Sequence, residues 1–362
     1  MNLDDIVEFQ KLDPENMYGH IDGLPDQLQV AWNLGHELPL PSWPAISAAT
    51  AIRQVVIAGM GGSAIGGDLL SAYLEPWSKV PIFVHRDYDL PACAAGPETL
   101  VIASSHSGNT EETLDAFGRA LARNCRILTI STGGKLAKAA AGAGVPAWTF
   151  EHHGQPRAAV GFSFGLLLAV FARLGLVAEP QAIAVEFSAA VEAMRLQQQT
   201  LRAEVPVARN PAKRMAGQLI GRYVSVLASG LLSPVARRWK GQVSEIGKAW
   251  AQFEFIPEAD HNTLAGTLNP EELLSHLIVL FLHSKADHPR NALRLEYTRQ
   301  VLMTEGINTD FFEASGESRL ASQWTALHFG DYVSYYLAMA YQVDPTPVTA
   351  LQKLKARLDA LK

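Results

Sequence analysis

The chain has 362 residues, of which 48% are apolar and 18% are charged, and its net charge is −6. This is an ordinary globular composition, long enough for two domains of typical size. No run of Lys and Arg dominates any stretch, which argues against a general nucleic-acid binder. Small anionic ligands stay possible, because backbone dipoles can hold them in an acidic protein.

The sequence contains few signals that indicate a cellular compartment. The only cysteines are Cys93 and Cys125, which have no metal-type spacing, so we expect a reducing compartment, the cytoplasm. The N-terminus is acidic and has no apolar segment of the signal-peptide kind. The long apolar run at 160–177 is interrupted by Arg173 and predicts a buried helix rather than a membrane span.

A strand–helix alternation begins after a lead-in over residues 1–50. Apolar runs that read as buried strands alternate with helical segments, and a glycine-rich turn followed by a helix over 63–74 comes after the first of them. The predicted strands are 52–59, 81–87, 99–105, 125–131 and 146–151. This alternation is typical of a parallel sheet with helices on both faces.

The second half repeats this organisation. A long helical region over 158–204, with a break at 178–180, separates the two halves. Strands are predicted at 222–229, 276–284 and 307–314, with a long helix over 233–252 that begins at Ser233 and Pro234. Helices over 326–342 and 346–362 close the chain. The fold class is therefore α/β, with two three-layer units in tandem.

The first predicted strand ends in the glycine-rich stretch AGMGGSAIGGD, residues 58–68. Glycines there allow close backbone approach, and the amides of the following helix can face an anion. Gly59, Gly61 and Ala64 also fit a loose dinucleotide fingerprint, with Asp87 as a possible ribose-binding acid. A nicotinamide dehydrogenase is thus one alternative, and a cluster of packing glycines is another.

The third predicted strand ends in SSHSGNTEET, residues 104–113. Ser105, Ser107 and Thr110 can donate hydrogen bonds to phosphate oxygens, Gly108 permits a sharp turn, and Thr110 can cap a helix starting at Glu111. Two strand-to-helix corners rich in small hydroxyl residues suit a phosphate monoester, and no Walker-type lysine is present. The alternative is a capped helix entry that binds nothing.

These two motifs, in this order, resemble the sugar isomerase (SIS) domain. The later stretches ARRWKGQVSEIGKAWAQFEFIPEADHN (236–262) and GDYVSYYLAMAYQVDPTPVTALQKLKARL (330–358) are similar to the bifunctional phosphoglucose/phosphomannose isomerase family. That family is a two-SIS-domain branch of the phosphoglucose isomerase superfamily, and the resemblance spans roughly 55–358. The chain departs from the family's pattern at Ser244 and Ile246, and at Ala259 and Asp260, where Asn or Leu-Asn is common.

The resemblance implies two tandem SIS-type domains. The segments expected from it are a lead-in over 1–50, a first domain over 51–178, a linking helix over 179–204, a second domain over 205–345 and a C-terminal helix over 346–362 that packs back on the active site. The expected oligomer is a homodimer with shared active sites, with no nucleic-acid or membrane partner.

The activity implied is interconversion of glucose 6-phosphate, and of mannose 6-phosphate, with fructose 6-phosphate through a cis-enediolate. Glu245 would carry the proton between C1 and C2, Arg157 would stabilise the enediolate, and His261 of the neighbouring subunit would assist ring opening. Lys355 would help ring opening, with Lys353 and Lys362 competing for that assignment. The phosphate-binding residues would be Gly62, Ser63, Ser105, Ser107 and Thr110.

No metal and no cofactor is expected, because the histidines show no helix-spaced ligand pair with a carboxylate. Each assignment has a plainer alternative: Glu245 as a solvated helix acid paired with Gln242 or Lys248, His261 as a turn-capping residue, Arg157 as an exposed residue at a helix start. A non-catalytic SIS regulator that binds a sugar phosphate is the other functional alternative.

Overall fold

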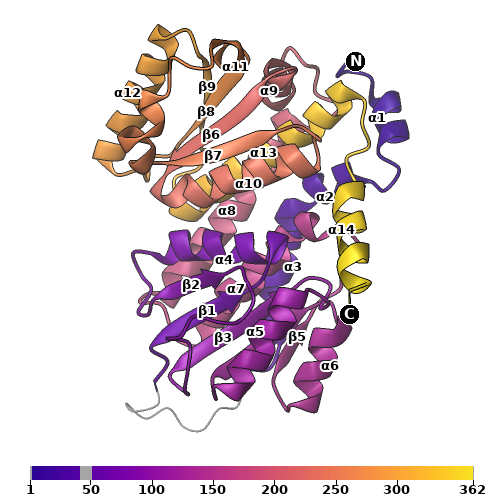
Figure 1. Ribbon diagram of the computed structural model, residues 1–362, viewed down its shortest axis with the longest axis vertical. Helices are drawn as coiled ribbons and strands as arrows, with labels where there is room; N and C mark the ends of the chain where they lie inside the picture. The colour runs from indigo at the N-terminus through magenta and orange to yellow at the C-terminus, as the bar shows by residue number, and fades with distance from the viewer. Residues whose placement is uncertain (1, 41–50, 362) are drawn as a thin grey trace. The chain divides into compact units, whose positions relative to one another are not determined.

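The computed structural model describes residues 2–40 and 51–361, and the contacts divide the chain into two units (Figure 1). The five-stranded unit comprises Gly23–Met194 and Gly316–Trp324. The four-stranded unit comprises Met1–Asp22, Arg195–Ser315 and Thr325–Lys362. Each unit contains one sheet with helices on its faces, which confirms the predicted α/β class.

The five-stranded sheet is parallel throughout, in the order β2-β1-β3-β4-β5. Because every strand runs the same way, all carboxyl ends lie along one edge. The chain goes from β1 outward to β2 and then returns to the other side of β1 for β3, so the order reverses between β1 and β3. Ligands of open α/β sheets bind at such a reversal. The strands are β1 (Gln54–Ala58), β2 (Ile82–His85), β3 (Thr99–Ser105), β4 (Arg126–Ser131) and β5 (Ala147–Thr149).

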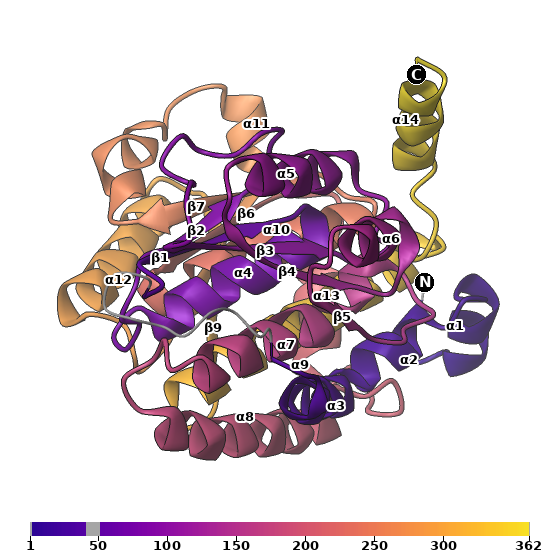
Figure 2. The ribbon, with the colours of Figure 1, turned by 90° about the horizontal axis from the view of Figure 1, so that it is seen from below.

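Alternating side chains of β1 and β3 face two helical layers, which Figure 2 shows on opposite sides of the sheet. Val56 and Val101 pack in a core cluster with Phe117 and Leu136 of α5 and α6. Ile57 instead faces α4, where it lies beside Gly67. The helices with the larger part of their length in this unit are α3 (Leu24–Glu37), α4 (Gly61–Leu74), α5 (Glu111–Ala122), α6 (Gly134–Gly142), α7 (Val160–Arg173) and α8 (Pro180–Leu201), together with the short η1 (Pro156–Ala158).

The four-stranded sheet, in the order β7-β6-β8-β9, repeats this topology and is also parallel. One face packs on α12 through Leu227, Phe281 and Leu295. The strands are β6 (Tyr223–Ser229), β7 (Ala251–Ile256), β8 (Leu277–His283) and β9 (Asn308–Glu313). The helices are α1 (Ile6–Leu12), α2 (Met17–Asp22), α9 (Pro211–Leu219), α10 (Ser233–Glu245), α11 (Glu271–Ser275), α12 (Pro289–Thr304), α13 (Arg319–Tyr341) and α14 (Thr349–Asp359), with short turns η2 (Gly230–Leu232), η3 (Glu258–His261) and η4 (Thr263–Ala265).

The eight predicted strands are all present, but the helix predicted over 233–252 is wrong beyond Glu245. Lys248 has φ of +53°, a left-handed conformation that does not continue a helix. Residues 251–256 form β7, an edge strand paired in parallel with β6. The alternation of Phe253 and Phe255 was the available signal for this strand, and the helical period of the preceding residues obscured it.

The predicted lead-in contains helices α1, α2 and α3 where the structure describes it, and its residues 41–50 lie outside the described part. Helix α3 packs against α7 at close range: a Cβ on Gly35 would lie 2.5 Å from the Cβ of Ala169, and one on Gly165 would lie 2.7 Å from that of Ala31. Small residues on both helices therefore allow the close approach. No helix of the described residues is long and apolar enough to cross a bilayer.

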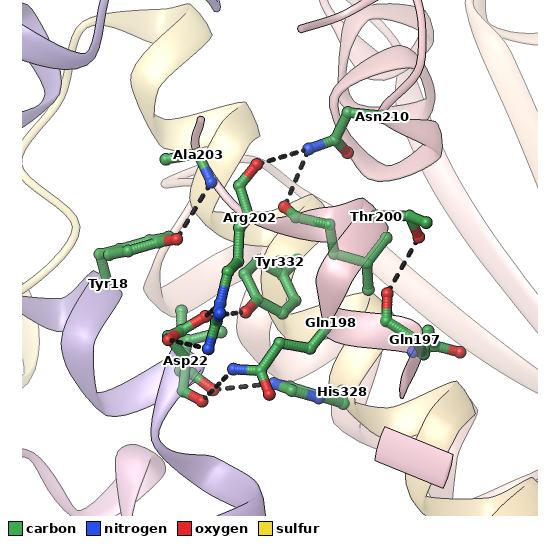
Figure 3. Close-up of polar contacts among 12 residues, drawn as sticks. Tyr18, Asp22, Gln197, Gln198, Thr200, Arg202, Ala203, Asn210, His328 and Tyr332 are labelled. Atoms are coloured by element: carbon green, nitrogen blue, oxygen red, sulfur yellow. Dashed lines mark hydrogen bonds and ion pairs between the residues drawn. The ribbon is translucent and has the colours of Figure 1, made fainter. Parts of the chain in front are cut away.

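Asp22, at the end of α2, is the centre of a polar cluster in the four-stranded unit (Figure 3). Its carboxylate accepts hydrogen bonds from the Tyr332 hydroxyl at 2.5 Å and from Arg202 Nε at 3.1 Å. The main-chain carbonyl of Asp22 accepts from Gln198 Nε2 at 2.7 Å, and the neighbouring carbonyl of Ile21 contacts His328 Nε2 at 2.8 Å. These bonds tie α2 to α8 and α13.

Burial alone would raise the pKa of the Asp22 carboxyl, but hydrogen bonds from Tyr332 and Arg202 outweigh it and hold that pKa below its ordinary value. The stabilisation from this carboxylate is therefore fully present above its unfolded pKa, near 4, and is lost as pH falls through the lower folded pKa.

We predict that Asp22→Asn lowers the free energy of unfolding by about 1–3 kcal/mol at pH 7, because the buried Tyr332 hydroxyl loses its charged acceptor. The difference from wild type should shrink as pH is lowered from 7 to 3. Urea unfolding of the full chain measures it, with the exposed Glu305→Gln as the control. An equal difference at both pH values, or none at pH 7, would contradict the assignment.

Candidate active site

The first corner of the candidate site joins β1 to α4 and depends on glycine. A Cβ on Gly59 would lie 2.6 Å from the carbonyl oxygen of Ser104, and one on Gly62 would lie 2.4 Å from the carbonyl oxygen of Pro156. Gly61 has φ of +50°. These glycines let the backbone turn tightly at the carboxyl end of β1. Gly66 and Gly67, further along α4, instead serve helix and strand packing, as the alternative interpretation expected.

The second corner joins β3 to α5 and contains three of the predicted hydroxyl residues. Ser105 ends β3, and its Oγ lies 2.8 Å from Thr110 Oγ1 and accepts from the Gly108 amide at 3.1 Å. Ser107 Oγ accepts from the Asn109 amide at 3.2 Å. Gly108 has φ of +65°, and a Cβ there would lie 1.9 Å from the carbonyl oxygen of Gly133, so the predicted sharp turn is present.

Thr110 occupies the N-cap position of α5, and the helix begins at Glu111 as the sequence predicts. The Thr110 side chain makes no capping hydrogen bond, however, and its hydroxyl is turned to Ser105 instead. The Ser105 hydroxyl can give its proton to Thr110, so that Thr110 keeps a proton for a ligand. The Thr110 hydroxyl therefore faces the corner between β3 and α5 and does not cap the helix.

A hydrogen bond joins the two corners: the His106 amide donates to Ser63 Oγ at 3.2 Å. Ser63, in the first turn of α4, and Ser107, on the β3–α5 turn, therefore both use their oxygen as an acceptor from a backbone amide. Each keeps its hydroxyl proton for a further acceptor. The corners follow the adjacent strands β1 and β3, between which the strand order reverses. This geometry can present hydroxyl and amide donors to a phosphate group.

The backbone of Arg157 lies beside the glycine corner that follows β1. Arg157 belongs to η1, after β5, and is 6% exposed, so it is a buried residue rather than an exposed one at a helix start. The Cβ position of Gly62 lies 3.5 Å from the Arg157 amide nitrogen. Gln27 of α3 donates to the Ala158 carbonyl at 2.8 Å and accepts from the Gly161 amide at 2.8 Å. The lead-in thus braces the segment carrying Arg157, a role that no sequence signal indicated.

Glu245, His261 and Lys355 belong to the four-stranded unit. Glu245 is the last residue of α10 and is half-buried. Of the partners considered for it, Gln242 donates its amide to Asp331 at 3.0 Å, and the Lys248 ammonium donates to the main-chain carbonyl of Glu245 at 2.5 Å. Lys355 is exposed on α14, as is Lys353, while Lys362 lies outside the described residues.

His261 ends η3 and is exposed. Its neighbour Asp260 is anchored to α12 by Thr298 Oγ1 at 2.7 Å and Arg294 at 3.1 Å, so the departure from Asn at this position brings its own hydrogen bonds. Of the three remaining departures from the family pattern, Ile246 and Ala259 are buried. Within residues 2–40 and 51–361 the His261 ring makes no hydrogen bond, so it does not act as a turn cap.

The topology keeps Glu245 and His261 apart within one chain. Helix α10 starts after the carboxyl end of β6 and runs back, so Glu245 lies near the amino edge of the sheet, just before β7 begins. His261 follows the other end of β7. Six residues of β7 separate the two edges, a span of roughly 20 Å. The structure therefore brings the hydroxyl residues together but does not bring Glu245 to His261.

The equivalent reversal in the four-stranded sheet, between β6 and β8, is already filled by a carboxylate. Asp287 accepts from Ser229 Oγ at 3.0 Å and from the Ser284 amide at 3.0 Å. Burial raises the pKa of Asp287, although those hydrogen bonds oppose the shift. Because a carboxylate occupies the donors there, we expect an anion to bind at the β1–β3 corners and not at this one.

The structure weakens the dinucleotide alternative. Dinucleotide-binding sheets place strands in the order 3-2-1-4, whereas β1 here lies between β2 and β3. The Asp87 carboxylate accepts from the Tyr88 amide at 2.8 Å. Among the described residues, no three His, Cys, Asp or Glu side chains lie together as metal ligands do. A groove of about 470 Å³, lined partly by Gln197, Arg214 and Phe311, contains none of the predicted site residues.

Two family models match this chain and show which class of protein it is. Residues 50–143 match the family model of the SIS domain, and residues 208–358 match that of the bacterial phospho-glucose isomerase C-terminal SIS domain. The fold is similar to that of a hypothetical protein from Thermus thermophilus, with a TM-score of 0.71, 18% identity, and coverage of 98% of this chain and 92% of the other. The chain is thus a protein of two SIS domains.

Sequence relatives define the family. The chain is 40% identical to the bifunctional phosphoglucose/phosphomannose isomerase of Caldicellulosiruptor bescii, over 96% of this chain and 100% of the relative. It is 34% identical to the Aquifex aeolicus protein of the same name, over 85% of this chain and 91% of the relative. The chain belongs to the bifunctional phosphoglucose/phosphomannose isomerase family, as the sequence motifs predict.

We predict that Ser107→Ala weakens binding of inorganic phosphate about 10-fold or more, because a hydrogen bond to a charged group is lost. Isothermal titration calorimetry on the full chain measures the affinity and should give one phosphate per chain. The control is Ser71→Ala, on the same helix as Ser63 but two turns further from the corner. Unchanged affinity in Ser107→Ala, or an equal loss in the control, would show that phosphate binds elsewhere.

Proposed function

We propose that this protein is a metal-independent aldose–ketose isomerase that interconverts glucose 6-phosphate and mannose 6-phosphate with fructose 6-phosphate. The observation that carries the proposal is the pair of hydroxyl-rich corners at the β1–β3 reversal, joined by the His106–Ser63 bond. The full-length similarity to bifunctional phosphoglucose/phosphomannose isomerases supports the choice of substrate. Glucose 6-phosphate and mannose 6-phosphate differ only in their configuration at C2, a carbon at which the reaction occurs.

The phosphate end of the substrate would bind first to fixed donors. Ser63, Ser107 and Thr110 would donate hydroxyl hydrogen bonds, Ser105 would hold Thr110 in place, and amides at the glycine corner with Gly62 would complete the grip. These groups sit at strand ends and a helix start, so little ordering is needed on binding. The phosphate would therefore fix the position of the sugar carbons.

The chemistry would occur at the other end of the sugar. His261 and Lys355 would transfer protons to and from the ring oxygen and hydroxyl to open the ring. The Glu245 carboxylate would take the C2 proton of the aldose and return it to C1 of the ketose. The Arg157 guanidinium, buried and always charged, would stabilise the enediolate oxygens between the two transfers.

We propose that the protein is a homodimer with shared active sites. Since β7 separates Glu245 from His261 in one chain, a site that uses both residues would take His261 from the partner chain. The loop carrying His261 is anchored to α12, on which Leu293 and Tyr297 are 62% and 61% exposed. These two residues are four positions apart on the helix, so they lie on one face and can form part of a surface covered by another protein. We propose that this surface lies in the subunit contact.

The remaining expectations fit this proposal. The SIS domains would extend over 51–178 and 205–345, joined by a helix over 179–204, and α14 would bring Lys355 to the substrate. Cys93 and Cys125 are free thiols, which supports a reducing cytoplasmic location. The proposed reaction would give the protein a role in glycolysis and gluconeogenesis.

We predict that Glu245→Gln lowers kcat for fructose 6-phosphate isomerisation at least 10³-fold, because the amide cannot carry the proton, while sugar-phosphate binding is retained. A coupled assay of glucose 6-phosphate formation measures it, with Glu272→Gln, an exposed acid of α11, as the control. Residual activity above about 1% would remove Glu245 from the base role. EDTA should leave the wild-type rate unchanged, and a loss on chelation would overturn metal independence.

A further inference from the structure

His106 and His152 form a hydrogen-bonded pair in the five-stranded unit. His106 lies between Ser105 and Ser107 on the phosphate turn, and His152 lies in the segment between β5 and η1, five residues before Arg157. His106 Nε2 is 2.9 Å from His152 Nδ1, and the two ring planes are nearly perpendicular. The pair therefore bridges the phosphate turn and the segment that carries the buried guanidinium.

The bonding pattern fixes which nitrogen donates. The Gly154 amide also donates to His152 Nδ1, at 3.2 Å, so Nδ1 of His152 is an acceptor and carries no proton. His106 must then donate through Nε2–H. Burial lowers the pKa of His106, which favours the neutral ring that this arrangement requires. Phe150 and Phe162, stacked 4.6 Å apart, contact the two imidazoles and hold their orientation.

The main chain of His106 is fixed independently of its ring. Its amide donates to Ser63 Oγ, and its carbonyl accepts from the Thr132 amide at 2.9 Å and the Thr132 hydroxyl at 2.7 Å. The backbone thus joins the ends of β3 and β4 to the start of α4. The His106 imidazole also connects these elements to the segment before η1, through its hydrogen bond to His152. A substitution of His152 would remove only this last connection.

We propose that the His106–His152 bond positions Arg157 relative to the phosphate donors, which makes both histidines positioning residues of the reaction proposed above. The inference rests on that proposed function. The phosphate and the reacting carbons are at opposite ends of a hexose phosphate, so the distance between the phosphate grip and the guanidinium must match the length of the substrate. A displacement of about 1 Å can cost about 10²-fold in rate.

The test is a set of His152 variants in the full chain. His152→Phe keeps an aromatic ring against Phe162 and removes the acceptor, whereas His152→Asn keeps a carbonyl oxygen that can accept in place of Nδ1. The matched control is His153→Phe, the same change at the exposed neighbouring position. Three quantities are measured: kcat for fructose 6-phosphate, affinity for inorganic phosphate, and affinity for 6-phosphogluconate, whose carboxylate takes the place of the enediolate.

We expect His152→Phe to lower kcat and the affinity for 6-phosphogluconate about 10- to 100-fold while inorganic phosphate binds as in wild type. His152→Asn should recover most of both losses, and His153→Phe should match wild type. Equal loss of both ligands would mean that the pair only maintains the phosphate turn, and no loss would mean that it positions nothing; either result overturns the proposal. If wild type isomerised no hexose phosphate, the proposed function would fail, yet the two affinities would still decide the role of the pair.

Discussion

The unlike edges of a parallel sheet are the constraint on which this protein's site depends. All strands of a sheet point the same way, so the turns that follow the strands lie at one edge and the turns that lead into them lie at the other. In the five-stranded unit this brings the glycine corner after β1 beside the hydroxyl corner after β3, where one bond from the His106 amide to Ser63 joins them. In the four-stranded unit it separates Glu245 from His261.

The two sheets share a topology and differ in chemistry at the reversal. Hydroxyl and amide donors at the β1–β3 corners are left with capacity for an anion, whereas Asp287 uses the comparable donors after β6 and β8. An internal carboxylate satisfies these donors without a ligand and excludes another anion by repulsion. The donors with capacity for an anion are therefore those of the five-stranded unit, and not the comparable donors of the four-stranded unit.

Much of this arrangement could be predicted from the sequence. The strands and the two ligand corners are encoded locally, in apolar runs followed by glycine or by closely spaced serines and threonines. Strand β7 was missed because helical periodicity runs into it from α10. The bond between His106 and His152 joins residues 46 positions apart, and Gln27 acts on Ala158 across 131 positions. No local pattern encodes such pairs, since neither residue changes the periodicity of its own segment.

Glu245 and His261 lie at opposite edges of the sheet, so an active site that uses both residues should take them from two different chains. Mixing Glu245→Gln and His261→Asn subunits, each inactive alone, by unfolding and refolding together tests this directly. Random pairing gives mixed dimers in which one of two sites has both wild-type groups, so about a quarter of wild-type isomerase activity should return. Activity that stays at the level of the separate variants would show that both residues act from the same chain, and would contradict the shared site.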